Sequence, residues 1–127
     1  MSLRIGIDIG STTVKVVVLD EQNKLLFRSY ERHYSKARER AAETLRSLAD
    51  RLAGRQVRIV ITGSAGLGVA KAAEIDFVQE VYATAAAVNQ YIPDTDAVIE
   101  LGGEDAKIIF LTGGLEERMN GSCAGGT

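Results

Sequence analysis

Hydrophobic residues in the first third of the chain follow the patterns of β-strands, with polar residues between them. Residues 3–9, 14–19 and 25–34 each predict a strand, and the last is reached through the polar turn 21–24. Residues 57–61 form a short, mostly apolar run, which is typical of a strand buried on both faces. The pattern therefore predicts three consecutive strands and a fourth after a gap.

The gap carries apolar residues at helical spacing from Ala37 to Leu52. We predict one helix here, with Ser35 as its N-cap and its end at Gly54. A glycine-rich turn at 62–66 leads into a short helix at 67–73. An alanine-rich helix follows at about 78–91 and ends before Pro93, the chain's single proline.

A second set of strands is predicted at 97–101, 106–111 and 115–119, joined by turns at 102–105 and 112–114. This repeats the earlier order of strand, acidic glycine turn and strand. We expect two related lobes that face one cleft, residues 1–94 and 95–127, the first with a mixed sheet. The second lobe shows no helix to cover its strands, so we expect the chain to be the N-terminal part of a longer protein. The alternative is that residues 95–127 extend the first sheet.

Composition narrows the classes of function. The 127 residues are 46% hydrophobic and 25% charged, which fits a soluble globular domain. The net charge of −2 gives no support for a nucleic-acid or membrane surface. No apolar run approaches the roughly 18 residues of a membrane-spanning helix. The single cysteine excludes an internal disulfide and fits a reducing cytoplasm.

The turn after the first strand is the strongest chemical signal. Asp8 ends the strand, and Gly10, Ser11, Thr12 and Thr13 follow it. Small side chains, free backbone N–H groups and hydroxyls together bind phosphate. An aspartate beside them holds magnesium through water. The alternative is an ordinary hairpin with polar turn residues.

Four stretches together carry a family resemblance. Residues 8–13 resemble the first phosphate motif of the actin-like ATPase and sugar-kinase superfamily, and residues 100–105 resemble its second. The helix that begins near Glu80 resembles the one connecting the lobes, whose glutamate points toward the metal. With the loop at 118–127, the chain resembles the activator ATPases of 2-hydroxyacyl-CoA dehydratases and benzoyl-CoA reductases. Glu100 and Glu104 replace the usual aspartate and glutamine, as in large fused relatives.

The resemblance implies an α/β fold with a ribonuclease-H-like, actin-type lobe. It places ATP and Mg²⁺ on the turns at 8–13 and 102–105. Asp8 would orient the hydrated metal, and Glu104 would position the attacking water. The implied nucleotide-binding residues are Gly10, Ser11, Thr12, Thr13, Lys15, Gly102, Gly103 and Asp105. The implied metal ligands are Asp8, Glu80, Glu100 and, for an iron–sulfur cluster, Cys123.

In this family a cysteine at the position of Cys123 ligates a [4Fe-4S] cluster shared across a homodimer, with two cysteines from each subunit. The implied function is ATP-driven electron transfer to an acyl-CoA dehydratase or reductase partner. Two alternatives stay open, a small-molecule kinase of the same superfamily and a non-catalytic actin-like assembly domain. Lys15 either reaches the phosphates or faces solvent, and Glu80 either approaches the metal or lies on the helix surface. His33 has no predicted role.

Overall fold

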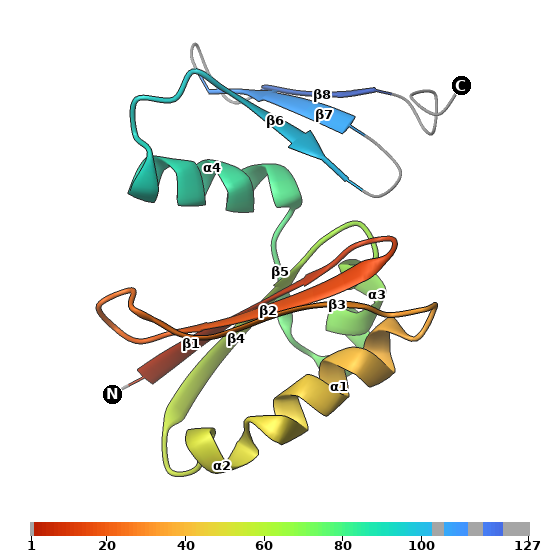
Figure 1. Ribbon diagram of the computed structural model, residues 1–127, viewed down its shortest axis with the longest axis vertical. Helices are drawn as coiled ribbons and strands as arrows, with labels where there is room; N and C mark the ends of the chain where they lie inside the picture. The colour runs from red at the N-terminus through yellow and green to blue at the C-terminus, as the bar shows by residue number, and fades with distance from the viewer. Residues whose placement is uncertain (1, 103–105, 112–115, 121–127) are drawn as a thin grey trace. The chain divides into compact units, whose positions relative to one another are not determined.

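The computed structural model describes residues 2–102, 106–111 and 116–120 (Figure 1). The chain forms two compact units, Met1–Val78 and Gln79–Thr127. The lobe boundary predicted after residue 94 stays a prediction. No helix among the described residues is long and apolar enough to cross a membrane.

The first unit contains a five-stranded mixed sheet in the order β3-β2-β1-β4-β5. β1, β2 and β3 pair antiparallel, whereas β4 and β5 pair parallel to β1 and β4 respectively. The predicted mixed sheet is therefore confirmed. β5 was not predicted, because two residues are too short to show a periodic pattern. The strands are β1 (Ser2–Ile9), β2 (Thr13–Leu19), β3 (Leu25–Arg32), β4 (Gln56–Thr62) and β5 (Asp76–Phe77).

Three helices, α1 (Ala37–Ser47), α2 (Ala49–Leu52) and α3 (Gly66–Ala73), lie on one face of this sheet (Figure 1). The core forms where alternate strand residues meet these helices, since successive strand side chains point to opposite faces. Burying such apolar side chains contributes roughly 25 cal/mol for each Å² removed from water. The buried core residues are Leu3, Ile5, Ile7, Ile9, Val14, Val16, Val18, Ala41, Leu48, Ile61 and Ala70.

The connection from β3 to α1 differs from the prediction. β3 ends at Arg32, and α1 begins after Lys36, so Ser35 is not the N-cap. Tyr34 and Ser35 adopt left-handed φ values of 49° and 64°, which turn the chain before the helix starts. The single helix predicted to reach Leu52 is interrupted at Leu48. There the backbone N–H bonds to Leu45, three residues back, in the tighter geometry of a 3₁₀ turn.

β4 is also less buried than predicted. Ile61 is buried, but Val57, Ile59 and Val60 are only partly buried, and Arg58 is exposed. The charged side chain in the middle of the apolar run marks the face of β4 that lies away from the core.

The second unit consists of α4 (Glu80–Tyr91) and an antiparallel sheet of its own, in the order β6-β7-β8. Its strands are β6 (Ala97–Leu101), β7 (Ala106–Phe110) and β8 (Glu116–Asn120). Extension of the first sheet by these residues is therefore excluded. α4 lies against one face of this sheet, so the expectation that no helix covers these strands is wrong (Figure 1).

The turn after β4 passes very close to the end of β1. Gly63 has φ +104°, and a Cβ there would lie 2.2 Å from the carbonyl oxygen of Ile9. The N–H of Ala65 donates to the same oxygen at 2.9 Å. This contact fixes the strand end that carries Asp8, and only glycine allows it.

Replacing Gly63 should therefore be costly. We expect Gly63→Ala to lower the free energy of unfolding by about 3 kcal/mol, from backbone strain and overpacking together. Gly54→Ala is the matched control, because Gly54 has φ +75° but a Cβ there would meet no atom within 4 Å. It should lose only the strain component, about 1 kcal/mol. Urea denaturation of both variants measures this, and equal losses would contradict the steric argument.

Candidate functional site

The predicted phosphate turn joins β1 to β2 as a tight connection. The N–H of Gly10 donates to the carbonyl of Thr13 at 2.9 Å and closes the turn. Ser11 lies exposed at the tip, Thr12 is partly buried, and Thr13 is buried as the first residue of β2. The turn therefore presents backbone and hydroxyl groups at the end of β1, beside Asp8.

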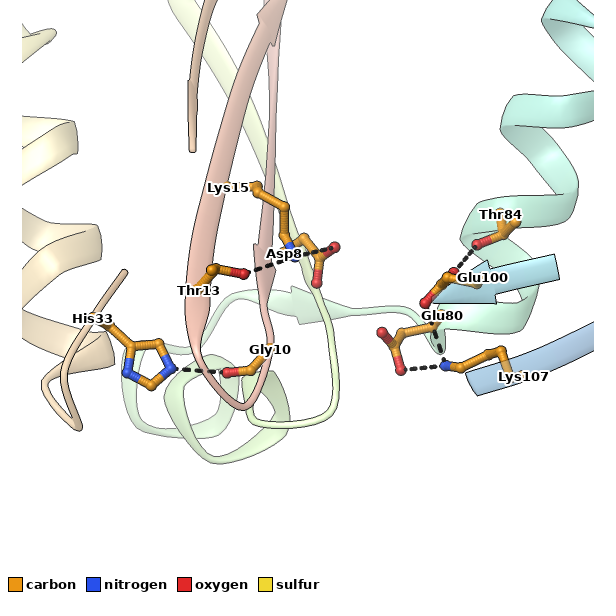
Figure 2. Close-up of polar contacts among 9 residues, drawn as sticks. All are labelled: Asp8, Gly10, Thr13, Lys15, His33, Glu80, Thr84, Glu100 and Lys107. Atoms are coloured by element: carbon orange, nitrogen blue, oxygen red, sulfur yellow. Dashed lines mark hydrogen bonds and ion pairs between the residues drawn. The ribbon is translucent and has the colours of Figure 1, made fainter. Parts of the chain in front are cut away.

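A row of polar side chains crosses the sheet on the face away from the core. Strand register pairs Asp8 with Lys15 on β2 and with Thr62 on β4, and Lys15 in turn pairs with Tyr30. Lys15 Nζ lies 3.4 Å from Asp8 Oδ2 and donates to Thr13 Oγ1 at 3.1 Å (Figure 2). It also lies 5.4 Å from the centre of the Tyr30 ring. Lys15 therefore points toward the turn.

Two oxygens of this row lack hydrogen-bond partners in the described part of the chain. Asp8 Oδ1 and Thr62 Oγ1 are buried and make no hydrogen bond to any described residue. Gly63 explains the burial of Asp8 Oδ1, because a Cβ on Gly63 would lie only 2.6 Å from it. An unsatisfied buried acceptor costs about 1–3 kcal/mol. The Asp8 side chain is nevertheless 37% exposed, so a ligand can bring a donor or a cation to the accessible part of this carboxylate.

The oxygen ligands of this site suit Mg²⁺ better than a metal ion whose ligands all come from the protein. No group of three or more histidine, cysteine, aspartate or glutamate side chains in the described parts of the chain is arranged to hold a metal ion. Mg²⁺ needs no such cage, because it binds through one or two carboxylates, waters and substrate phosphates. Asp8 supplies one partly exposed carboxylate, beside a turn suited to phosphate.

His33 contacts this turn, and sequence reasoning missed it. Its ring is buried, and Nε2 lies 2.9 Å from the carbonyl oxygen of Gly10 (Figure 2). A lone histidine at a strand end belongs to no motif. Only the pairing of β3 with β2 brings it to residues more than twenty positions earlier.

The second unit brings together two of the predicted metal ligands around a lysine. Lys107 Nζ lies 2.9 Å from Glu80 Oε2 at the start of α4 and 3.7 Å from Glu100 Oε1 on β6 (Figure 2). The Lys107 side chain is 5% exposed. Thr84 Oγ1 also approaches Glu100, at 3.5 Å. Sequence reasoning missed Lys107, although it lies directly opposite Glu100 in the β6–β7 register.

Of the remaining predicted site residues, Gly102 directly follows β6 and is exposed. The other four lie outside the described residues. Those four are Gly103, Glu104, Asp105 and Cys123. Asp8, Thr13 and Lys15 therefore form one group in the first unit, and Glu80 and Glu100 form another in the second.

Solved structures show which fold this is. The (R)-2-hydroxyglutaryl-CoA dehydratase component A of Acidaminococcus fermentans superposes with a TM-score of 0.77 at 20% identity, over 94% of this chain and 48% of that chain. An Aquifex aeolicus Ppx/GppA phosphatase superposes at 0.59 with 15% identity, over 94% and 52% of the two chains. These similarities confirm the predicted actin-like fold of the lobe.

Two further comparisons concern activators of one dehydratase. The activator of the 2-hydroxyisocaproyl-CoA dehydratase from Clostridium difficile, solved with bound ADPNP, has a TM-score of 0.70 and 28% identity, over 93% of this chain and 45% of that chain. The 2-hydroxyisocaproyl-CoA dehydratase activator of Clostridioides difficile is 30% identical over 141 residues, 96% of this chain and 47% of the relative. The chain thus spans about half the length of this relative.

The family of BadF/BadG/BcrA/BcrD ATPases matches residues 5–127, which include both candidate groups of site residues. The chain therefore belongs to the BadF/BadG/BcrA/BcrD ATPase family.

Proposed function

We propose that this chain provides phosphate-binding elements of an ATPase that activates electron transfer to an acyl-CoA dehydratase or reductase. The observation that carries the proposal is the partly exposed Asp8 carboxylate beside Lys15 and the Gly10–Thr13 turn. Family membership supports ATP as the ligand, and the similar activator with bound ADPNP supports nucleotide binding.

Each residue of the first group has a distinct task in this proposal. The N–H groups and hydroxyls of the turn bind phosphate oxygens, and the Lys15 ammonium adds positive charge beside them. Asp8 would hold Mg²⁺, directly or through its water, with the exposed part of its carboxylate. When bound, Mg²⁺ neutralises charge that develops on the transferred phosphoryl group. In the second phosphate turn, Gly102, Gly103 and Asp105 bind phosphate, and Glu104 orients the attacking water.

The proposed electron transfer depends on Cys123. Thiolate is the usual protein ligand of an iron–sulfur cluster, and a [4Fe-4S] cluster needs four. This chain has one cysteine, so the other ligands come from outside these residues, across a homodimer or paired domains. The relative that activates a 2-hydroxyisocaproyl-CoA dehydratase supports a dehydratase as partner. The proposal places the protein in the reducing cytoplasm, where thiolate ligands persist.

Glu80 and Glu100 both lie beside the ammonium group of Lys107. Lys107 already neutralises much of their charge, at 2.9 Å and 3.7 Å. A cation held by these carboxylates must share them with Lys107. Asp8 pairs with a lysine that lies at 3.4 Å and is 32% exposed, so it is the stronger metal ligand of the three.

The first test is Asp8→Asn in the full-length protein. The amide keeps the shape but loses the charge that holds the metal, so we expect ATP turnover to fall about 100-fold or more. Asp50→Asn, on the exposed surface of α2, is the control and should leave turnover unchanged. Steady-state ATP hydrolysis at varied Mg²⁺ measures both. Parental turnover with parental magnesium dependence in Asp8→Asn would show that Asp8 is only a turn residue.

The second test is the iron content of Cys123→Ser, with the protein purified without oxygen. Serine keeps the size but removes the thiolate, so most of the iron and the visible absorption of the cluster should disappear. Ser122→Ala, the neighbouring substitution, should retain both. If Cys123→Ser kept the iron content of the parent, the ligand assignment would be wrong and a kinase of the same superfamily would become the better interpretation.

The third test concerns Lys107. Lys107→Met removes the ammonium and leaves two carboxylates facing each other, so we expect a loss of about 2 kcal/mol in the free energy of unfolding. This value is lower than for a fully buried pair, because the Glu80 and Glu100 side chains are 26% and 38% exposed.

Two further variants interpret that result. Lys71→Met, on an exposed face of α3, should change stability by less than about 0.5 kcal/mol. Adding Glu80→Gln and Glu100→Gln to Lys107→Met should restore part of the loss, because the repulsion is removed. No restoration would mean that Lys107 stabilises the unit through contacts other than these carboxylates.

A further inference from the structure

His33 is a buried histidine that the proposed ATP chemistry does not use. It follows the last residue of β3, is 7% exposed, and both of its ring nitrogens have partners. Nδ1 accepts a hydrogen bond from the N–H of Ser35 at 3.1 Å, and Nε2 lies 2.9 Å from the carbonyl oxygen of Gly10 (Figure 2).

These partners define the protonation state of the ring. A backbone N–H only donates, so Nδ1 must carry a lone pair, and a carbonyl oxygen only accepts, so Nε2 must carry the proton. Both requirements give the same neutral tautomer. His33 is therefore a hydrogen-bond donor aimed at the phosphate turn.

The backbone of His33 holds the same turn at a second point. Its N–H donates to the carbonyl of Thr12 at 3.0 Å. The carbonyls of Gly10, Thr12 and Thr13 therefore all have protein donors, the last from the N–H of Gly10. Because a trans peptide group is planar, its C=O and the following N–H point in opposite directions. The ring that binds the Gly10 carbonyl thus sets the direction of the Ser11 N–H.

The segment after His33 holds the ring in place. Tyr34 and Ser35 have φ values of 49° and 64°, a region that is unfavourable for residues other than glycine. This conformation brings the Ser35 N–H to Nδ1 and the Lys36 N–H to the His33 carbonyl, at 2.8 Å. Two residues in an unfavourable conformation thus serve to orient one imidazole.

We propose that His33 is a positioning residue for nucleotide binding: its Nε2–H orients the Gly10–Ser11 peptide so that the Ser11 N–H faces the bound phosphate. The inference rests on the proposed function, because it assigns the turn to phosphate. It adds a residue outside both phosphate motifs, which acts through the turn and does not touch the ligand.

Two substitutions of His33 test the roles of its two ring nitrogens separately. The amide oxygen of His33→Asn replaces Nδ1 as acceptor for Ser35, but the side chain is too short to reach Gly10. The longer amide of His33→Gln donates to the Gly10 carbonyl and leaves Ser35 without its acceptor. Loss of one neutral hydrogen bond should weaken ATP binding by His33→Asn about fivefold to tenfold. His33→Gln should bind ATP within about twofold of the parent although its melting temperature falls, because the lost bond is in the local turn.

Ser35→Gly is the matched control, because it keeps the backbone N–H and relieves the left-handed conformation. It should leave ATP affinity unchanged and should not lower the melting temperature. Calorimetric titration of the full-length protein with ATP and Mg²⁺ measures the affinities. Equal weakening in His33→Asn and His33→Gln, or none in either, would overturn the positioning role.

Nuclear magnetic resonance of the protein without nucleotide tests the same role independently of binding. We expect the Nε2–H tautomer in the parent, and a Ser11 amide signal that shifts in His33→Asn and returns toward the parental position in His33→Gln. An Nδ1–H tautomer, or a Ser11 amide unaffected by His33→Asn, would overturn the inference. A parent that bound no nucleotide would instead refute the proposed function, while the Ser11 amide would still decide whether His33 orients the peptide.

Discussion

The whole arrangement depends on the alternation of side chains along β1. Leu3, Ile5, Ile7 and Ile9 point into the core, and Asp8 points to the opposite face at the end of the strand. β1 is the middle strand of the sheet, paired on one side with β2 and on the other with β4. A slip of one residue in either pairing would turn the isoleucines out of the core and bury the Asp8 carboxylate. The apolar core therefore fixes the position of the carboxylate.

The sheet face that carries Asp8 is polar, and the described residues supply hydrogen-bond or ion-pair partners for only some of its oxygens. Lys15 takes Asp8 Oδ2, whereas Oδ1 is covered by the Gly63 turn without a donor from any described residue. The close approach of Gly63 thus has two effects. It holds the end of β1, and it covers Asp8 Oδ1, so a ligand reaches the carboxylate only through its exposed part.

Much of this could be predicted from the sequence, because the signals are local. Strand alternation indicated β1 and β2, the glycine-rich turn before α3 marked its start, and Asp8 with the following turn indicated phosphate. What could not be predicted depends on contacts between distant segments. His33 meets Gly10 only after β3 pairs with β2, and Lys107 meets Glu80 only after β7 packs on α4. β5 is two residues long, and the break at Leu48 interrupts no apolar periodicity. Residues of the second phosphate turn and Cys123 remain predictions from resemblance.

Both units contain the same local arrangement of an acidic residue, a turn and a lysine, but the lysine affects the carboxylates differently in each. In each, an acidic residue precedes a glycine-containing turn, and a lysine seven positions later lies directly across the hairpin: Asp8 with Lys15, and Glu100 with Lys107. Lys15 is 32% exposed and contacts one carboxylate, whose second oxygen stays unpartnered among the described residues. Lys107 is 5% exposed and lies between two carboxylates. The cross-strand pair at the first turn therefore leaves part of the Asp8 carboxylate available to a ligand. At the second turn, Lys107 neutralises most of the charge of Glu80 and Glu100. Neutralised carboxylates repel phosphate less, so the second turn is better suited to accept an anion than to hold a cation.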